Sequence, residues 1–331
     1  MQRLIWTVIA AFVMAIALGP VVIPWLKKLK LGKVMYKLGP DHAAKAGTPQ
    51  MGGIIFAPPA LIATILFCKK GAGSMALLPL VLVSALGFGM IGFIDDYLKV
   101  HRHSSEGLTP RQKFAPQIVL AVVLSVWAWL DRRIGGSLRV PFFNVEWDLG
   151  WFYVPVMVFI LVGTVNSANL LDGLDGLLGG CSLFDFAAMA LICVTLAAAD
   201  PGQADSLMNV GVFGAAMVGG LLGFLRYNAH PARVFMGDVG SFFIGGALVG
   251  MALVTRLSLL LPIIALAMVL SSVSDLIQFA YFRATHGKRF FKMAPLHHHF
   301  EKCGMPETSI VAMYHIATVV LCLLALLGYV G

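Results

Sequence analysis

Two adjacent carboxylates, Asp95 and Asp96, end a long apolar run in the stretch FIDDYLK. Neighbouring carboxylates repel each other unless a cation lies between them, and Lys99, one helical turn further along, could supply that positive charge. The pair could also be a solvated helix end, since most acidic side chains lie at the surface. The functional interpretation is a pair that binds Mg²⁺ or handles a phosphate group, because Mg²⁺ prefers oxygen ligands.

A second set of polar residues occupies the stretch NLLDGLDGL. Asn169, Asp172 and Asp175 follow one another at intervals of three residues, which places them on one face if a helix begins here. Gly173 and Gly176 allow a backbone or a ligand to come close. Helix capping needs only one such residue, so three aligned polar groups favour a binding site.

The stretch FMGDVGS places Asp238 among glycines. A short glycine-flanked loop exposes a carboxylate together with backbone amides, which suits a metal ion bound to a phosphate. Phe235 could stack on a nucleic base, although an aromatic side chain in the core or facing lipid is the commoner case.

Two weaker signals lie elsewhere. Asp275 and Gln278 stand three residues apart inside an apolar run, where an acidic residue is a functional candidate. Lys45 and Thr48, in the stretch DHAAKAGTPQMGG, could bind anionic oxygens or belong to a plain turn.

Three consecutive histidines, His297, His298 and His299, follow a proline in the stretch APLHHHFE. Adjacent residues rarely converge on one tetrahedral ion, so zinc is disfavoured, while a polar loop remains an alternative. Imidazoles can donate hydrogen bonds to phosphate oxygens. Because consecutive residues in an extended or irregular loop cannot all point one way, we expect His297 and His298 to contact the ligand and His299 to be more structural.

The composition shows what kind of elements must position these residues. The chain has 331 residues, of which 59% are hydrophobic and 12% charged, and its mean hydropathy is +0.87. Soluble domains carry about 25% charged residues, so the chain is a polytopic membrane protein. Five cysteines share no spacing pattern, which argues against a disulfide framework or a zinc site.

Ten apolar runs could cross a bilayer as helices. We expect an all-α protein of about ten transmembrane helices, forming a single integral membrane catalytic domain over residues 1–331. The first run lacks an A-x-A-like cleavage site, so we expect it to be retained. The runs are 4–26, 52–68, 75–94, 115–130, 151–168, 177–199, 207–225, 240–255, 257–282 and 309–330.

Basic residues assign the loops to two sides of the membrane. Loops 27–51, 95–114, 169–176, 226–239 and 283–308 carry 17 Lys and Arg, whereas the rest of the chain carries 7. Cytoplasmic loops hold the excess of basic residues, so these loops should be cytoplasmic and both termini outside. The aspartate and histidine motifs share this side, which predicts one site at the cytoplasmic face. On the other side, RRIGGSLRVPFFNVEWDLGW favours a short outer β-hairpin.

Taken together, FIDDYLK, NLLDGLDGL, FMGDVGS and PLHHHFE resemble motifs of the polyprenyl-phosphate N-acetylhexosamine-1-phosphate transferase superfamily. PLHHHFE and KAGTPQMGG are more specific and resemble its bacterial cell-wall branch, the phospho-N-acetylmuramoyl-pentapeptide transferases. The resemblance covers nearly the whole chain. It implies Mg²⁺-dependent transfer of phospho-N-acetylmuramoyl-pentapeptide from its UDP carrier to undecaprenyl phosphate, which gives lipid I and UMP for peptidoglycan synthesis. It also implies the bacterial cytoplasmic membrane, a bent ninth helix and a homodimer.

The resemblance also implies roles for individual residues. Asp238 would bind Mg²⁺, with Asn169, Asp95 and Asp96 as further candidate ligands. Asp95 and Asp96 would handle the lipid phosphate and, with Asp238 and His297, form the catalytic set. Asp175 and Phe235 would hold uracil. The remaining residues would line the nucleotide–sugar site: Lys45, Thr48, Lys99, Asn169, Asp172, Asn228, Gln278, His298 and His299.

Two rival functions remain at this point. A sister transferase would use UDP-N-acetylglucosamine, and the histidine run argues against it. A lipid transporter would be expected to show broken helices and acids at the membrane midplane, whereas the aspartates of the three acidic motifs lie at one interface. We expect lipid as a partner and no nucleic acid.

Overall fold

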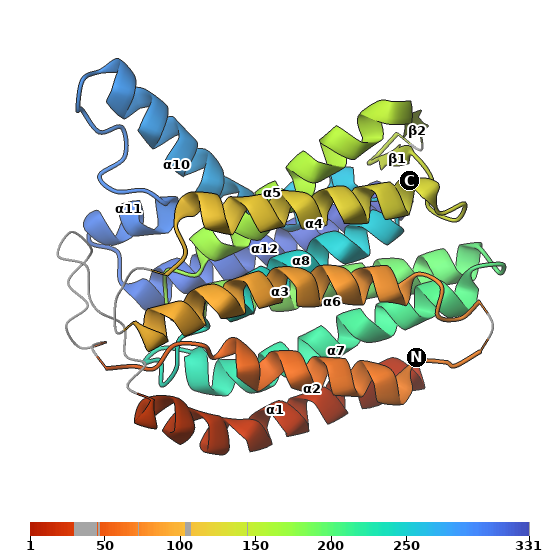
Figure 1. Ribbon diagram of the computed structural model, residues 1–331, viewed down its shortest axis with the longest axis horizontal. Coiled ribbons are helices and arrows are strands. Elements are labelled where there is room, and N and C mark those ends of the chain that lie inside the picture. Colours follow the sequence, from red (N-terminus) through yellow and green to blue (C-terminus); the bar gives the residue numbers. More distant parts are fainter. Residues whose placement is uncertain (30–44, 46, 72, 103–106, 144, 331) are drawn as a thin grey trace.

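The computed structural model describes residues 1–29, 45, 47–71, 73–102, 107–143 and 145–330. Most of the long helices lie side by side along one axis (Figure 1). In chain order the helices and strands are α1 (Gln2–Lys28), α2 (Gly53–Phe67), α3 (Leu78–His101), α4 (Pro110–Leu130), β1 (Ser137–Val140), β2 (Val145–Asp148), η2 (Gly150–Phe152), α5 (Tyr153–Leu171), α6 (Leu177–Ala199), α7 (Ala204–Asn228), α8 (Gly237–Val254), η3 (Ser258–Leu260), α9 (Leu261–Ile264), α10 (Leu266–Ala284), α11 (Leu296–Lys302) and α12 (Glu307–Val330).

The helices agree with a polytopic membrane protein. Among the described residues, eight helices are long and apolar enough to cross a membrane, or nine if one bent pair counts as a single span. The second expected run is the shorter apolar helix α2, of 15 residues. The ninth run is broken, because Ser258–Ile264 and Leu266–Ala284 meet at an angle of 85°. The bend implied for the ninth helix is therefore confirmed.

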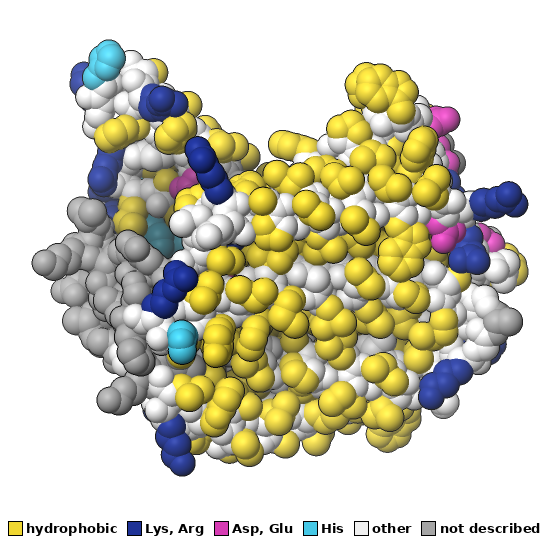
Figure 2. Space-filling view, viewed as in Figure 1, with side chains coloured by type: hydrophobic (Ala, Val, Ile, Leu, Met, Phe, Trp, Pro, Cys, Tyr) yellow, Lys and Arg dark blue, Asp and Glu magenta, His cyan; other side chains and the backbone are white. Residues whose placement is uncertain are grey.

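The surface separates apolar and charged regions. Apolar side chains cover the middle of the face shown in Figure 2, while Lys and Arg side chains gather toward the two ends of the long helices. A lipid-facing band between charged ends is the arrangement that a bilayer requires. In the interior, α8 and α7 are the most deeply buried of the spans, and the other helices surround them.

Glycines set the distance between the central helices α3 and α8. A Cβ on Gly246 would lie 2.6 Å from the carbonyl oxygen of Ser84, and one on Gly250 would lie 3.0 Å from the Ser84 Cβ. A Cβ on Gly92 would overlap the carbonyl of Asp238. Small residues of this kind let membrane helices approach backbone to backbone. Their consequence here is that the end of α3 lies against the beginning of α8.

The expected hairpin is confirmed. Strands β1 and β2 pair antiparallel, with Ser137 opposite Asp148 and Val140 opposite Val145. The hairpin is tied to the helices because the Phe142 N–H donates to the carbonyl of Gly328 at 2.8 Å, near the end of α12. Both chain termini lie at this end of the bundle (Figure 1).

The histidine stretch corrects one expectation. Residues Leu296–Lys302 form the short helix α11, so the prediction of an extended or irregular loop is wrong. Pro295 immediately precedes the helix, a position where its missing N–H costs nothing.

Candidate active site

Three carboxylates from two helices meet at the end of the bundle opposite the termini. Asp95 and Asp96 belong to the last turns of α3, and Asp238 is the second residue of α8. One oxygen from each lies within 4.8 Å of the others. Asp95 and Asp96 are only 1% and 2% exposed. The Val239 N–H at the start of α8 donates to Asp96 at 3.0 Å, as expected for an anion near a helix N-terminus.

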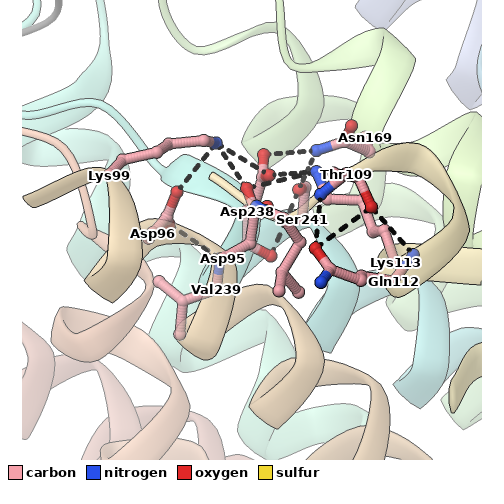
Figure 3. A network of polar contacts seen from close by, with 11 residues as sticks. Asp95, Asp96, Lys99, Thr109, Gln112, Lys113, Asn169, Asp238, Val239 and Ser241 are labelled. Atoms are coloured by element: carbon pink, nitrogen blue, oxygen red, sulfur yellow. Dashed lines mark hydrogen bonds and ion pairs between the residues drawn. The ribbon is translucent and has the colours of Figure 1, made fainter. Parts of the chain in front are cut away.

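Two lysines neutralise part of this negative charge (Figure 3). The ammonium of Lys99 lies 2.6 Å from Asp95, 3.4 Å from Asp96 and 3.0 Å from Asp238. The ammonium of Lys113 lies 2.7 Å from Asp238 and 3.2 Å from Asp95. Three carboxylates and two ammonium groups leave a formal charge of −1. Lys99 was predicted from the sequence, whereas Lys113 was not.

The position of Lys113 has a local cause. Helix α4 begins at Pro110, upstream of the expected position 115, because Thr109 and Gln112 form a reciprocal capping box with proline in the first turn. Lys113 therefore lies in the first turns of α4, and the preceding loop reaches back to α3, since the Leu108 N–H donates to Asp95 at 2.8 Å. The signal for a helix start was present in the sequence, but nothing there named the partner of Lys113.

Asn169 completes this cluster from α5. Its side-chain amide donates to Asp238 at 2.7 Å and to the Ser241 hydroxyl at 2.9 Å. Figure 3 shows Asn169 on the opposite side of Asp238 from Lys99. Four helices, α3, α4, α5 and α8, thus each contribute a polar side chain to one point.

The donor set at this point suits Mg²⁺. Mg²⁺ takes hard oxygen ligands and is commonly held by one or two carboxylates together with substrate phosphates. Asp95, Asp96 and Asp238 supply such oxygens, and the residual negative charge favours a cation. The residues that would hold Mg²⁺ are therefore these three aspartates, whereas Asn169 turns its amide N–H group toward Asp238.

A second polar cluster ties distant segments together. The ammonium of Lys45 lies 2.8 Å from Asp175 and 2.6 Å from Glu307. Glu307, the first residue of α12, also accepts a hydrogen bond from the Asp175 N–H at 2.7 Å. The His230 Nδ1 atom lies 3.3 Å from Asp175 and 3.5 Å from Glu307. His230 and Glu307 were not predicted, since a histidine beside a proline and an acid opening a helix are ordinary in sequence.

The end of α5 and the loop between α5 and α6 contribute to both clusters. Helix α5 ends at Leu171 and α6 begins at Leu177, as the apolar runs predicted, so no helix begins at Asn169 and the condition for aligning the three polar residues on one helical face is not met. Asn169 contacts Asp238 in the first cluster. Asp175 contacts Lys45 in the second. Asp172 is half-buried at the C-terminal end of α5.

Other predicted residues hold this end of the bundle together. The Asn228 side chain accepts from the Gly176 N–H at 3.1 Å and donates to the Val234 carbonyl at 3.0 Å. Phe235 bonds through its backbone to Pro49 and Gly52, both at 2.8 Å. The Thr48 N–H donates to the Lys45 carbonyl at 3.2 Å. The segment around Lys45 is thereby fixed to the approach to α8.

The three histidines have three different environments. His297 is fully buried and its ring lies against Gly173, where a Cβ would overlap the Nε2 atom. Burial, assisted by the neighbouring His298, lowers the pKa of His297 from 6.5 to about 3, so its imidazole is neutral. Neither of its ring nitrogens has a hydrogen-bond partner among the described residues. His298 lies 2.6 Å from Glu301, and His299 accepts from the Lys292 N–H at 3.1 Å.

Gln278 contacts protein rather than either cluster. Its side-chain oxygen accepts from the Phe290 and Phe291 N–H groups at 3.1 and 2.9 Å. Asp275, one turn earlier in α10, is half-buried. The structure thus connects Gln278 with the segment that leads to α11.

Comparisons with known proteins identify the family of the chain. The model of the family described as glycosyl transferase family 4 matches residues 78–256. A phospho-N-acetylmuramoyl-pentapeptide-transferase of Thermoanaerobacter sp. (strain X514) is 44% identical over 97% of this chain and 96% of its own length. Proteins of the same name from Heliobacterium modesticaldum and Bacillus subtilis (strain 168) are 41% and 40% identical, each over 99% of this chain and 98% and 97% of their own lengths. The chain therefore belongs to glycosyl transferase family 4 and, within it, to the family of the phospho-N-acetylmuramoyl-pentapeptide-transferases.

Proposed function

We propose that this protein transfers phospho-N-acetylmuramoyl-pentapeptide from its UDP carrier to undecaprenyl phosphate, releasing UMP and leaving lipid I. The observation that carries the proposal is the cluster of three aspartates and two lysines at one end of an apolar helical bundle. A reaction between a soluble diphosphate and a lipid phosphate needs a charged site at the membrane boundary. The similarity to the named relatives extends over almost the full chain.

The reaction balances without an added proton carrier. An oxygen of the lipid phosphate attacks the sugar-linked phosphorus of the donor, the new P–O bond forms, and the P–O bond to UMP breaks. A phosphate monoester has its second pKa near about 6, so it is already mostly dianionic at neutral pH. A strong general base is therefore not required, and we favour one direct displacement over a covalent aspartyl intermediate.

The main task of the site is to bring negative charges together. Lys99 and Lys113 reach the same Asp238 oxygen and can turn toward phosphate oxygens when these arrive. Bound Mg²⁺ would polarise the diphosphate and stabilise charge on the leaving UMP. Asp95 and Asp96 hold the two lysines in place and position the lipid phosphate, while Asn169 orients Asp238.

The second cluster would bind the nucleotide. Lys45 and Asp175 present a cation and a carboxylate on one surface, which suits the polar edge of uracil. The neutral His297 imidazole would donate one hydrogen bond to the donor's phosphate or sugar, and His298 would add a second. Asn228, Thr48, Phe235, Asp172, Gln278 and His299 would shape or support the same surface.

Location and assembly follow from the same proposal. The protein would lie in the bacterial cytoplasmic membrane as one catalytic domain, with the site at the cytoplasmic face and both termini outside. The excess of basic residues on the loops at the site supports this orientation. The protein would act as a homodimer, and its mass in detergent, measured by light scattering, tests that part.

UMP release from purified protein tests the function. We expect release with UDP-N-acetylmuramoyl-pentapeptide, undecaprenyl phosphate and Mg²⁺, and none without Mg²⁺. Release with UDP-N-acetylglucosamine instead would identify the sister transferase. Movement of lipid across vesicle membranes with no UMP release from either donor would identify a transporter.

A further inference from the structure

The end of α10 and the segment after it form a projecting basic arm, here residues 276–292. Helix α10 leaves the bundle after the 85° bend, and its C-terminal end stands away from the long helices (Figure 1). The arm contains Arg283, Lys288, Arg289 and Lys292 but no Asp or Glu. All four basic side chains are exposed, and Figure 2 shows basic side chains at this projection.

Large apolar side chains accompany these charges. Leu276 is 67% exposed, Phe279 is 61% exposed and Phe290 is 59% exposed. The Arg283 guanidinium lies 5.2 Å from the centre of the Phe279 ring. Exposed aromatic and basic side chains together are typical of segments that lie in the interface of a membrane, where the rings enter the headgroup region and the cations remain at the phosphates.

The arm is a folded unit. Gln278 accepts hydrogen bonds from the Phe290 and Phe291 N–H groups, which fastens the returning segment to α10. The rings of Tyr281 and Phe290 pack at 5.5 Å, and those of Phe290 and Phe291 pack at 4.9 Å. The backbone that carries the charges is therefore already ordered, so binding an anionic surface requires little further ordering of the chain.

The direction of the arm selects the partner. The long helices define the membrane normal, and α10 leaves them sideways at the end of the bundle that carries the aspartate cluster (Figure 1). A segment that leaves sideways at this level overhangs the lipids beside the protein. Its formal charge of +4 without any acidic residue complements anionic headgroups.

We propose that the basic arm binds the headgroups of anionic phospholipids in the leaflet next to the active site. The inference does not depend on the reaction that the site performs. Each Lys or Arg near an anionic surface strengthens binding by about fivefold, so four such residues should give a clear preference for anionic over zwitterionic lipid.

Lipid selectivity can be measured on the intact protein without any substrate. The protein is reconstituted in phosphatidylcholine vesicles that contain a trace of spin-labelled phosphatidylglycerol or spin-labelled phosphatidylcholine, and the motionally restricted fraction of each label is compared. We expect an excess of restricted phosphatidylglycerol in the wild type, decreasing as salt screens the charges. Replacing all four residues, as Arg283→Gln, Lys288→Gln, Arg289→Gln and Lys292→Gln, should remove most of this excess.

A matched control removes the same amount of positive charge from the opposite end of the helical bundle. Lys69, Lys70, Arg132 and Arg133 are also exposed, and their replacement by Gln should leave the selectivity close to that of the wild type. Lys288→Glu with Arg289→Glu changes only the tip of the arm, and it should lower the selectivity even if the fourfold variant does not fold. The proposal is overturned if the tip variant keeps wild-type selectivity, or if the control loses as much as the arm variants.

Discussion

Gly92 of α3 lies against the backbone carbonyl of Asp238 in α8, so closely that a Cβ on Gly92 would overlap the carbonyl atoms. The obstacle is backbone, which cannot rotate away as a side chain can. The distance between the aspartate pair and the third aspartate is therefore fixed by a residue that carries no polar group.

Gly92→Ala should separate α3 from α8 and disturb the cluster. We expect a loss of about 1–3 kcal/mol in stability and a fall of at least tenfold in kcat, measured by thermal unfolding in detergent and by UMP release. Gly163→Ala in α5 is the control, because a Cβ there meets nothing within 4 Å and alanine favours a helix. Equal behaviour of the two variants would contradict the proposed role of Gly92.

Asp238→Asn should remove most activity and weaken the dependence on Mg²⁺. Asp238 is the carboxylate that both lysines and Asn169 approach, and an amide is a weaker ligand for a hard cation. The rate as a function of Mg²⁺ concentration provides the measurement. Wild-type turnover at low Mg²⁺ in the variant would exclude Asp238 as a metal ligand.

Lys113→Gln should lower kcat by roughly 10²-fold, because one of two cations that offset phosphate repulsion is lost. Lys113→Arg should recover part of the rate, since the charge is kept at a similar position. Arg111→Gln, an exposed position in the same first turn of α4, removes an equal charge and should have little effect. If kcat falls by the same factor in the Arg111 and Lys113 variants, the loss comes from general surface charge and not from the position of Lys113.

Glu307→Gln should raise KM for the UDP donor by about tenfold and change kcat less. Glutamine can still accept from the Asp175 N–H, but the charge pair with Lys45 is lost. Glu307 is a positioning residue in this account, so the split between KM and kcat is the informative measurement. Glu146→Gln on the hairpin, which loses an exposed pair with Arg256, should leave both constants unchanged.

Because His297 is buried as a neutral imidazole, the free energy of unfolding should decrease as the pH falls. Burial holds its pKa at about 3 in the folded protein, against 6.5 for the ordinary imidazole. Below pH 6.5 the unfolded chain binds a proton at His297 that the folded protein does not bind. The free energy of unfolding therefore falls by about 1.4 kcal/mol per pH unit between pH 6.5 and pH 3, and this contribution is complete above pH 6.5. The titratable group beside His297 is His298, which is bonded to Glu301 and lies in turn near Asp275.

Unfolding midpoints between pH 7.5 and 5.5 test this sign. His297→Gln should show a shallower dependence than the wild type, because the amide does not titrate. In activity, His297→Ala should reduce kcat/KM by roughly 10²-fold, and His297→Gln should recover part of that loss, since an amide can donate one hydrogen bond. A wild-type pH slope in the Gln variant would mean that other groups cause the acid sensitivity.

The sequence predicted the helices better than the connections between them. Apolar runs located every long helix, because a bilayer imposes length and hydropathy directly. The hairpin was visible in the alternation after a Gly-Gly pair. The start of α4 was placed too late, since Pro110 and Thr109 precede the apolar run and only capping chemistry marks them.

The site was predictable in its residue types and less so in its pairings. The aspartates and Lys99 stand in dense polar motifs, and residues of three of these motifs meet at Asp238. Lys113 and Glu307 stand beside ordinary helix starts, and only the packing of distant helices gives them partners. The helical conformation of the histidine stretch could not be predicted either, because a seven-residue helix has no periodic signal of its own.

The position of Lys99 on the same helix as Asp95 and Asp96 has a consequence for biosynthesis. Asp238 is made 139 residues after Lys99, so for much of translation the aspartate pair has no contact with α8. Lys99, at i+4 and i+3 from the two acids, accompanies them into the translocon and provides a counter-ion from the outset. The nascent helix can thus settle at the bilayer boundary before the other residues of the aspartate cluster exist.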